Sequence, residues 1–140
     1  MAEQSDRCVR SRDDLERYIG HFNRKEYAQQ IAYYAPDVQY KVGTLTLSSP
    51  QQIADFYADF HQHSNEHIQL VKFALTGDVC AAAMATRFEP FRDYRQHGLT
   101  FLAGTPVDIV SLVFYTLRQD KIWRIRMARF AGTLAEFSGA

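Results

Sequence analysis

Tyrosines on apolar helical stripes are the first side chains in this sequence that could do chemistry. In the segment 50–63, one face at helical spacing consists of Ile53, Phe56, Tyr57 and Phe60. A phenol on such a buried face normally finds a hydrogen-bond partner, either in the fold or on a ligand. Tyr18 stands in a similar stripe of Leu15, Tyr18, Ile19 and Phe22. A phenol of this kind can donate to a carbonyl or enolate oxygen on which charge develops.

Three ionisable side chains in apolar, strand-like runs are candidates for moving protons. Asp108 precedes IVSLVFYTL, and it is either a rim residue in water or a pocket acid whose pKa is raised by burial. His67 lies in EHIQLVKFAL, and it is either a general acid or base near neutral pH or an exposed residue at a strand start. Glu89 lies near the end of CAAAMATRFEPF, two residues from Arg87, so these two side chains either pair with each other or serve a site.

The sequence shows neither a metal site nor a cofactor site. His61 and His63 close a predicted helix, where cations favour the C-terminus, and their spacing turns them to opposite sides. Cys8 and Cys80 form neither a disulfide framework nor a metal-ligand spacing. Walker loops, dinucleotide glycine motifs and a nucleophile elbow are not found. We therefore expect no metal and no cofactor.

The overall composition argues against several classes of partner. The formal net charge of zero speaks against a nucleic-acid or membrane surface driven by bulk charge. No apolar run reaches the length that spans a bilayer, and the polar N-terminus lacks the apolar core of a signal peptide. We expect one domain, since 140 residues are enough to close a core. We also expect the protein to be cytoplasmic.

The periodicity of the apolar residues predicts helices followed by a sheet. Helices are predicted over 11–22, 26–35 and 50–63, and strands over 37–42, 45–47, 66–76, 79–91, 107–117 and 121–130. Residues 92–106 are predicted to form a long loop, and residues 1–10 and 133–140 to be tails of a domain over 11–132. This order indicates an α+β fold with its helices on one face of a curved antiparallel sheet.

Three stretches resemble a known superfamily when they are taken in this order. RYIGHFNRKEYAQQIAYYAPDVQY, SPQQIADFY and FYTLRQDKIWRIRMARF are similar to segments of the nuclear transport factor 2-like superfamily. Within it, the chain looks most like the SnoaL-type polyketide cyclases and the ketosteroid isomerases. The resemblance implies a cone-shaped sheet covered by three N-terminal helices around a cavity. This fold hosts isomerases, cyclases, dehydratases, epoxide hydrolases and binding modules, so it selects no single function.

Ketosteroid isomerases hold three hydrogen-bonded tyrosines beside their oxyanion hole, and the resemblance places Tyr18, Tyr34 and Tyr57 at those positions. The position of the isomerase's general base falls near Val42, and that of its oxyanion acid near Leu112 or Val113. The chain therefore lacks both carboxylates, and we do not expect a ketosteroid isomerase.

The resemblance also implies which side chains face the cone. It turns His67 inward, and Asp108 points inward if it alternates with Val110 and Leu112, although a one-residue bulge would reverse this. The resulting candidates for catalysis are Tyr18, Tyr57, His67, Asp108 and Glu89. The resulting candidates for substrate binding are Tyr34, Phe22, Phe56, Phe60, Val71, Phe73, Met127 and Arg129. The loop 92–106, with Asp93 and His97, would lie over the mouth as a lid.

These expectations lead to one lead hypothesis and two alternatives. The lead is a cofactor-independent isomerase or cyclase that acts by acid–base chemistry on a small apolar oxygenated metabolite of polyketide or terpenoid type. Dehydration or epoxide opening in the same cavity is the first alternative. A non-catalytic ligand-binding or dimeric interaction module is the second. The resemblance further implies a homodimer through the convex face of the sheet.

Overall fold

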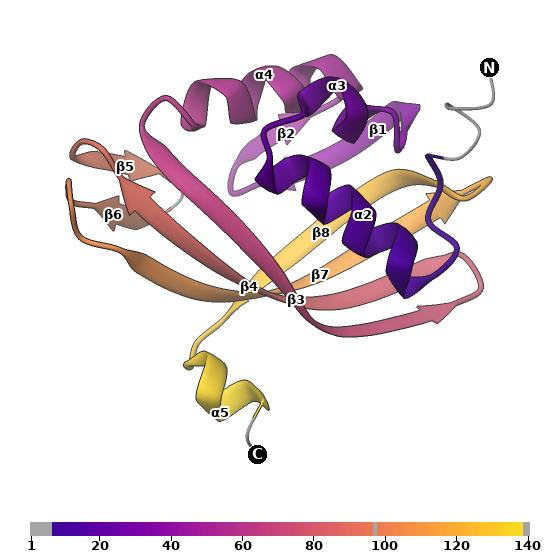
Figure 1. Cartoon of the computed structure of the whole chain (residues 1–140). Coiled ribbons are helices and arrows are strands. Elements are labelled where there is room, and N and C mark those ends of the chain that lie inside the picture. The colour runs from indigo at the N-terminus through magenta and orange to yellow at the C-terminus, as the bar shows by residue number, and fades with distance from the viewer. Residues whose placement is uncertain (1–6, 97, 139–140) are drawn as a thin grey trace.

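Three helices lie on one side of a curved sheet, and a short fourth helix lies on the other side (Figure 1). This arrangement comes from a computed structural model that describes residues 7–96 and 98–138. The helices are α2 (Arg12–Asn23), α3 (Tyr27–Ile31), α4 (Pro50–Phe60) and α5 (Leu134–Ser138). The strands are β1 (Tyr34–Val42), β2 (Leu45–Leu47), β3 (Ser64–Thr76), β4 (Val79–Pro90), β5 (Tyr94–Gln96), β6 (Leu99–Phe101), β7 (Val107–Arg118) and β8 (Lys121–Phe130). The predicted α+β class is confirmed.

Serine caps start the two longer helices where the sequence predicted them. The Ser11 hydroxyl accepts a hydrogen bond from the amide of Asp14 at 3.2 Å. The Ser49 hydroxyl accepts one from the amide of Gln52 at 3.1 Å, and the Gln52 side chain accepts from the amide of Ser48. Such caps satisfy amides that have no partner within the helix. They set the starts of α2 and α4, and therefore the apolar faces that cover the sheet.

The predicted second helix is shorter than expected. It was predicted over 26–35, but α3 ends at Ile31, and Tyr34 already pairs with Ile122 of β8. The amide of Ile122 donates to the carbonyl of Tyr33 at 2.8 Å. Pro36 also disfavours helical geometry at the residue before it, because the proline ring clashes with that residue's backbone. Strand pairing in the core therefore overrides the local helical pattern.

The main sheet has the strand order β2-β1-β8-β7-β4-β3. The hairpins β3–β4 and β7–β8 are antiparallel, as predicted. The expectation of a wholly antiparallel sheet is wrong at one place, since β1 runs parallel to β8. The reason is that β1 pairs with the last strand of the chain, far away in the sequence, and not through a hairpin. Within the described residues, no helix is long and apolar enough to cross a membrane.

Strand register divides the sheet into two faces. We call the face toward α2, α3 and α4 the inner face and the opposite one the outer face. In β7, Ser111 and Val113 lie on the inner face, opposite Met84 and Ala82 of β4. A bulge between Leu70 and Lys72 changes the alternation along β3. Residues that are paired across neighbouring strands lie on the same face of the sheet. The pairing register therefore shows which residues face the helices and which face outward.

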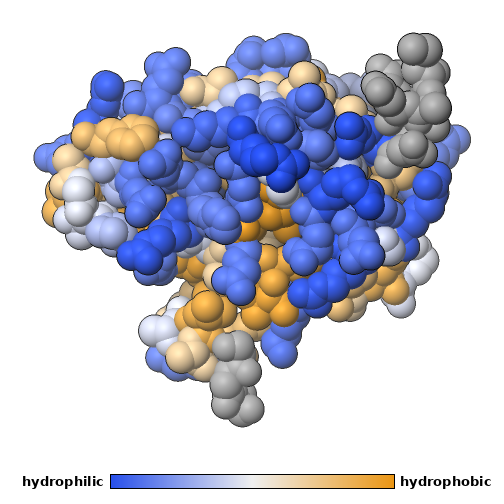
Figure 2. Space-filling view, viewed as in Figure 1, coloured by the Kyte–Doolittle hydropathy of each residue, from blue (hydrophilic) through white to orange (hydrophobic). Residues whose placement is uncertain are grey.

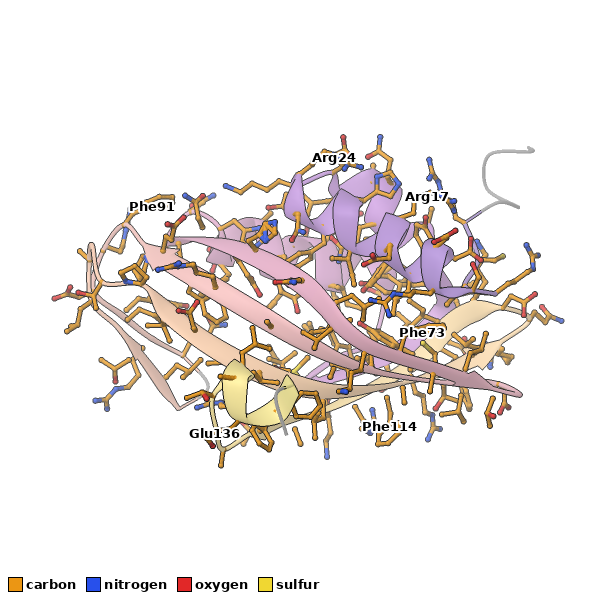
Figure 3. The ribbon with its side chains drawn as sticks, turned by 60° about the horizontal axis from the view of Figure 1, so that its bottom comes forward. Arg17, Arg24, Phe73, Phe91, Phe114 and Glu136 are labelled. Carbon is orange, nitrogen blue, oxygen red and sulfur yellow. The ribbon has the colours of Figure 1, made fainter. Side chains whose placement is uncertain are left out.

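The outer face is apolar over its centre. Its paired positions hold Val79, Ala81, Ala83, Ala85, Val110, Leu112, Phe114 and Ala128, with Arg126 beside Phe114 and Lys72 beside Ala83. Figure 3 shows Phe114 on the side of the molecule opposite Arg17 of α2 and Arg24, which follows α2. In Figure 2, apolar atoms gather between α5 and the strands above it, while the helical half of this view is mostly hydrophilic. The helix α5 covers part of this face, with Phe137 against Phe130 at a ring distance of 5.3 Å.

The segment predicted as a long loop contains the hairpin β5–β6. Phe101 of β6 packs against Phe60 of α4 and Phe88 of β4, at ring distances of 5.8 and 5.1 Å. Burial of this aromatic cluster is what orders the segment. Asp93 is exposed and accepts from the amide of Ala103, and His97 lies outside the described residues. Gln96, Leu99 and Phe101 of this segment line the cavity, and its role as a lid stays a prediction.

The described ends of the chain also pack onto the domain. Cys8 and Val9 were expected in a flexible tail, but they are 5% and 1% exposed. The amide of Val9 donates to the carbonyl of Asp120 at 2.8 Å. Apolar burial together with a backbone hydrogen bond explains this docking.

Candidate functional site

A cavity of about 310 Å³ lies between the helices and the inner face of the sheet. Its apolar wall includes Phe22, Phe56, Phe60, Met84, Phe88, Phe101, Ile109 and Val113. Its polar atoms come from the side chains of Tyr18, Gln30, Tyr40, Tyr57, Glu66, Thr86, Gln96, Ser111, Tyr115 and Arg129. An apolar pocket with a few convergent polar groups is the usual form of a small-molecule site.

Two tyrosine pairs lie in or behind the cavity wall. Tyr18 and Tyr34 are joined by a hydrogen bond of 2.6 Å between their hydroxyls, and Gln30 Nε2 donates to the Tyr34 hydroxyl at 3.0 Å. The hydroxyls of Tyr40 and Tyr57 form a second pair, also at 2.6 Å. The predicted cluster of Tyr18, Tyr34 and Tyr57 is therefore replaced by two pairs. Tyr40, on the same face of β1 as Val38 and Val42, is the member that sequence reasoning missed.

Burial keeps these phenols neutral. It raises the pKa of Tyr34 to about 12, although hydrogen bonds from Tyr18 and Gln30 act against it. Burial also raises the pKa of Tyr18 and of Tyr57 well above the ordinary value of 10, with a further rise from the neighbouring tyrosines. The phenols of the cavity therefore act as hydrogen-bond donors at neutral pH and not as bases.

Glu66 is the acid in the cavity wall, and it was missed from the sequence. Its side chain is 9% exposed, and its Oε1 lies 3.1 Å from Nε2 of His61. Nδ1 of His61 lies 2.6 Å from the hydroxyl of Tyr27. Burial raises the pKa of the Glu66 carboxyl, and the hydrogen bond and charge of His61 act in the opposite direction. We call Tyr27, His61 and Glu66 the buried triad.

Two features explain why sequence reasoning did not find the buried triad. Glu66 was taken only as the first residue of a strand, while the face containing His67 was turned inward. The structure places Glu66 and Ile68 in the cavity wall, so alternation from Ile68 would have indicated Glu66. His61 was assigned to the exposed end of a helix, but its side chain is 3% exposed and lies between the rings of Tyr27 and Tyr57.

The inward placement of His67 is wrong, the alternation that would turn Asp108 inward is not found, and the candidate Glu89 also lies outside the cavity. Asp108 is paired across the strands with Arg87, and Arg87 with His67, so the three form a row on the outer face. Asp108 and Arg87 lie 3.7 Å apart with side chains 70% and 56% exposed. Glu89 is exposed and does not line the cavity. The physical reason is register: in β7 it is Ile109 and Ser111, not Asp108 and Val110, that face the helices.

The predicted substrate-binding residues divide into two groups. Those in the cavity wall are Phe22, Phe56, Phe60, Met127 and Arg129. Tyr34 lies behind Tyr18, Val71 is at the β3 bulge, and Phe73 packs against the core elsewhere. The bulge after Leu70 turns Phe73 onto the inner face opposite Ala82, where it packs against the core outside the cavity wall. Contact of the wall residues with a substrate stays a prediction.

The described residues contain no group of three or more His, Cys, Asp or Glu side chains placed to hold a metal ion. Among the described residues, the cavity wall offers hydrogen-bond donors in its phenols and in Arg129, and one carboxyl group, that of Glu66.

Known proteins share the architecture of this chain. The profile of the SnoaL-like domain family matches residues 15–125. Among curated proteins, no sequence matches the chain. A proposed polyketide cyclase from a Silicibacter species has a similar structure, with 19% identity and a TM-score of 0.71, over 91% of this chain and 91% of that chain.

Two further solved structures share this fold. A protein from Catenulispora acidiphila with a ketosteroid isomerase-like fold, solved with trimethylamine, is 14% identical over 89% of this chain and 91% of its own, with a TM-score of 0.70. An LEH-like epoxide hydrolase from M. tuberculosis is 9% identical over 83% of this chain and 79% of its own, with a TM-score of 0.65. At these identities the likeness shows the fold alone.

Proposed function

Because the chain belongs to the SnoaL-like domain family, we propose that it is a cofactor-independent isomerase or cyclase of a small apolar oxygenated metabolite. The substrate class proposed is a polyketide or terpenoid, and the chemistry is acid–base. The observation that carries this proposal is the Tyr40–Tyr57 hydroxyl pair in the wall of an apolar cavity of about 310 Å³. The cytoplasmic location stays a prediction.

A hydroxyl pair of this kind offers one proton to a ligand. In each pair one phenol donates to the other, so the accepting phenol keeps its own O–H for a further partner. In a cavity with few polar groups, such a donor stabilises charge on a carbonyl or enolate oxygen more than it would in water. Tyr40 and Tyr57 would therefore hold the substrate oxygen, and Tyr18 offers a second position.

Dehydration or epoxide opening uses the same cavity in a different way. The phenol donor would then protonate a leaving hydroxyl or an epoxide oxygen instead of an enolate. The likeness to an epoxide hydrolase is one of fold, so it supports the shared cavity and does not choose between these reactions.

The first experiment is a crystal structure soaked with a panel of small ketones, enones and phenols. We expect a ligand oxygen within hydrogen-bond distance of the Tyr40–Tyr57 pair. In solution, Tyr57→Phe should weaken binding of the same ligand, whereas Tyr33→Phe should not, because Tyr33 is buried outside the cavity wall. Ligands that bind equally well to both variants would contradict the proposed site.

We also propose that the outer face pairs with a second copy of this chain. Leu112 and Phe114 are 36% and 57% exposed at its centre, and the alanines of β4 leave it flat. A contiguous exposed apolar patch on a sheet face is typical of an interface. The dimerisation common in the family favours a second copy over a different partner. A monomer at all concentrations in sedimentation would contradict this proposal.

A further inference from the structure

We propose that Glu66 is the group that takes and returns the substrate proton, and that His61 and Tyr27 position it and connect it to solvent. This inference rests on the proposed function, because it names the base of the same cavity. It is carried by the geometry of the buried triad, which the family resemblance did not predict.

The position of Glu66 follows from the register of β3. Glu66 is paired with Phe88 and Ile68 with Thr86, and all four residues line the cavity. The carboxyl is close enough to the Tyr40–Tyr57 pair that its charge raises the pKa of both phenols, after the larger effect of burial. A base and an oxygen-binding donor therefore lie in the same cavity, as proton abstraction next to a carbonyl group requires.

The carboxyl has one oxygen available for the substrate. Among the described residues, the hydrogen bond to Glu66 is the one between Oε1 and His61 Nε2. When Glu66 is ionised, Nε2–H donates to Oε1, and Nδ1 accepts from the Tyr27 hydroxyl. Oε2 is then left to accept a proton from a bound carbon acid.

The chemical step balances with these groups alone. The C–H bond next to the substrate carbonyl breaks, and its proton forms an O–H bond on Glu66. The electron pair of the broken C–H bond forms a C=C bond, and the π pair of the carbonyl moves to its oxygen, which becomes an enolate oxygen held by the tyrosine pair. In an isomerisation, Glu66 returns the proton to another carbon. In a cyclisation, the enolate carbon attacks a second carbonyl, and Glu66 protonates the alkoxide that forms.

His61 is a positioning residue, since it acts through Glu66. Its ring is stacked between Tyr27 and Tyr57 at 5.8 Å from each. Tyr27 is only partly buried, so the buried triad comes nearest to solvent at this residue. A solvent proton that reaches Tyr27 moves its hydroxyl proton to Nδ1 and the Nε2 proton to Glu66. Both hydrogen bonds of the triad are kept in either protonation state.

Among the described residues, the titratable groups nearest Glu66 are His61 after α4, Tyr27 of α3, Tyr57 of α4 and Tyr40 of β1. The same cavity is also lined by Tyr18 of α2, Tyr115 of β7 and Arg129 of β8. The neighbour on β4 is Phe88, which has no charge. The pH profile of proton transfer should therefore report the buried triad.

The test measures exchange of the acidic hydrogens of 2-tetralone for deuterium in D₂O by NMR, with a panel of cyclic enones as further probes. We expect wild-type protein to catalyse exchange above the buffer rate. Glu66→Gln should lower the catalysed rate roughly 100-fold or more, with the affinity for the ketone nearly unchanged. Glu89→Gln is the matched control, because this exposed acid does not line the cavity.

His61 and Tyr27 are tested by the pH profile. The hydrogen bond from His61 lowers the pKa of Glu66, so His61→Phe should move the acid limb of the rate profile to higher pH. Tyr27→Phe keeps the ring stack and should move the acid limb less, in the same direction. If His61→Phe does not fold, Tyr27→Phe alone decides, and an unmoved profile overturns the role of the relay.

The possible failures are distinguishable. Exchange that persists in Glu66→Gln at the wild-type rate overturns the role of Glu66 and leaves the proposed function standing. Wild-type protein that binds members of the panel but exchanges none of them overturns both proposals.

Discussion

The two faces of one sheet show how differently the same kinds of side chain can be used. On the inner face and above it, Glu66 and the Tyr40–Tyr57 pair lie among aromatic rings with little solvent. On the outer face, Asp108 and Arg87 form an ion pair whose side chains are more than half exposed. The acid that looked catalytic in the sequence lies in water, and the acid in the cavity did not stand out.

The difference between the two acids is one of solvation. An exposed ion pair gains little, since water and salt screen both charges. A buried carboxyl loses hydration, which raises its pKa and makes its ionised form costly for the fold. The cavity keeps such a group and places His61 beside it, which is the basis of the proposed proton transfer. The following predictions test this comparison between the two acids.

The largest effect is expected on turnover. Glu66→Gln should lower the rate roughly 100- to 10,000-fold, which is the usual contribution of a general acid or base. Asp108→Asn should leave the rate within about two-fold, since its side chain is 70% exposed on the outer face. Steady-state kinetics on any substrate found by the exchange assay would compare the two variants. An equal loss of rate in both variants would contradict the proposed difference between the inner and the outer face.

The next effect is on assembly. Phe114→Glu should weaken a dimer on the order of 100-fold, because a central apolar anchor of an interface is typically worth 2 kcal/mol or more. Phe91→Glu is the control, since Phe91 is as exposed but lies outside the outer face defined above. Sedimentation at several concentrations would measure both. A dimer that tolerates Phe114→Glu would place the interface elsewhere.

A smaller effect is expected on ligand affinity. Tyr57→Phe removes one hydroxyl of the cavity pair and should lower the affinity for a bound ketone about five-fold, or ~1 kcal/mol. Tyr33→Phe removes a buried hydroxyl outside the cavity wall and should leave the affinity unchanged. Isothermal titration calorimetry would measure the affinity of both variants for the same ketone. The same loss in both variants would point to general loosening of the core.

The effect of pH on stability should depend on Glu66. Because the pKa of Glu66 is higher in the folded than in the unfolded chain, stability is greatest below its ordinary value of 4.5 and falls as pH rises through the folded pKa. Glu66→Gln should therefore be more stable than wild type at pH 7, by about 1.4 kcal/mol for each unit of pKa difference. Urea unfolding at pH 4 and pH 7 measures this. A variant less stable at pH 7 would show that the triad stabilises the fold.

The smallest effect is expected for the outer ion pair. Arg87→Ala should change the free energy of unfolding by ~0.5 kcal/mol or less, since both side chains are largely solvated. Thermal unfolding at low and high salt would detect any contribution. A loss several times larger would mean that this row is covered in solution.

The sequence alone determined the parts of this protein that depend on local spacing. The caps at Ser11 and Ser49, the stripes containing Tyr18 and Tyr57, and the hairpins β3–β4 and β7–β8 all follow from the identity of nearby residues. Helix starts, helical faces and turns are local, so their patterns can be read without knowing what packs against them.

Only the tertiary structure decided which side chains share the cavity. The β3 bulge after Leu70 and the register of β7 assign Glu66 to the inner face and Asp108 to the outer face. A shift of one residue exchanges the faces of a strand, and long-range pairing sets that shift. The buried triad combines α3, the end of α4 and β3, whose residues meet only when the helices cover the sheet.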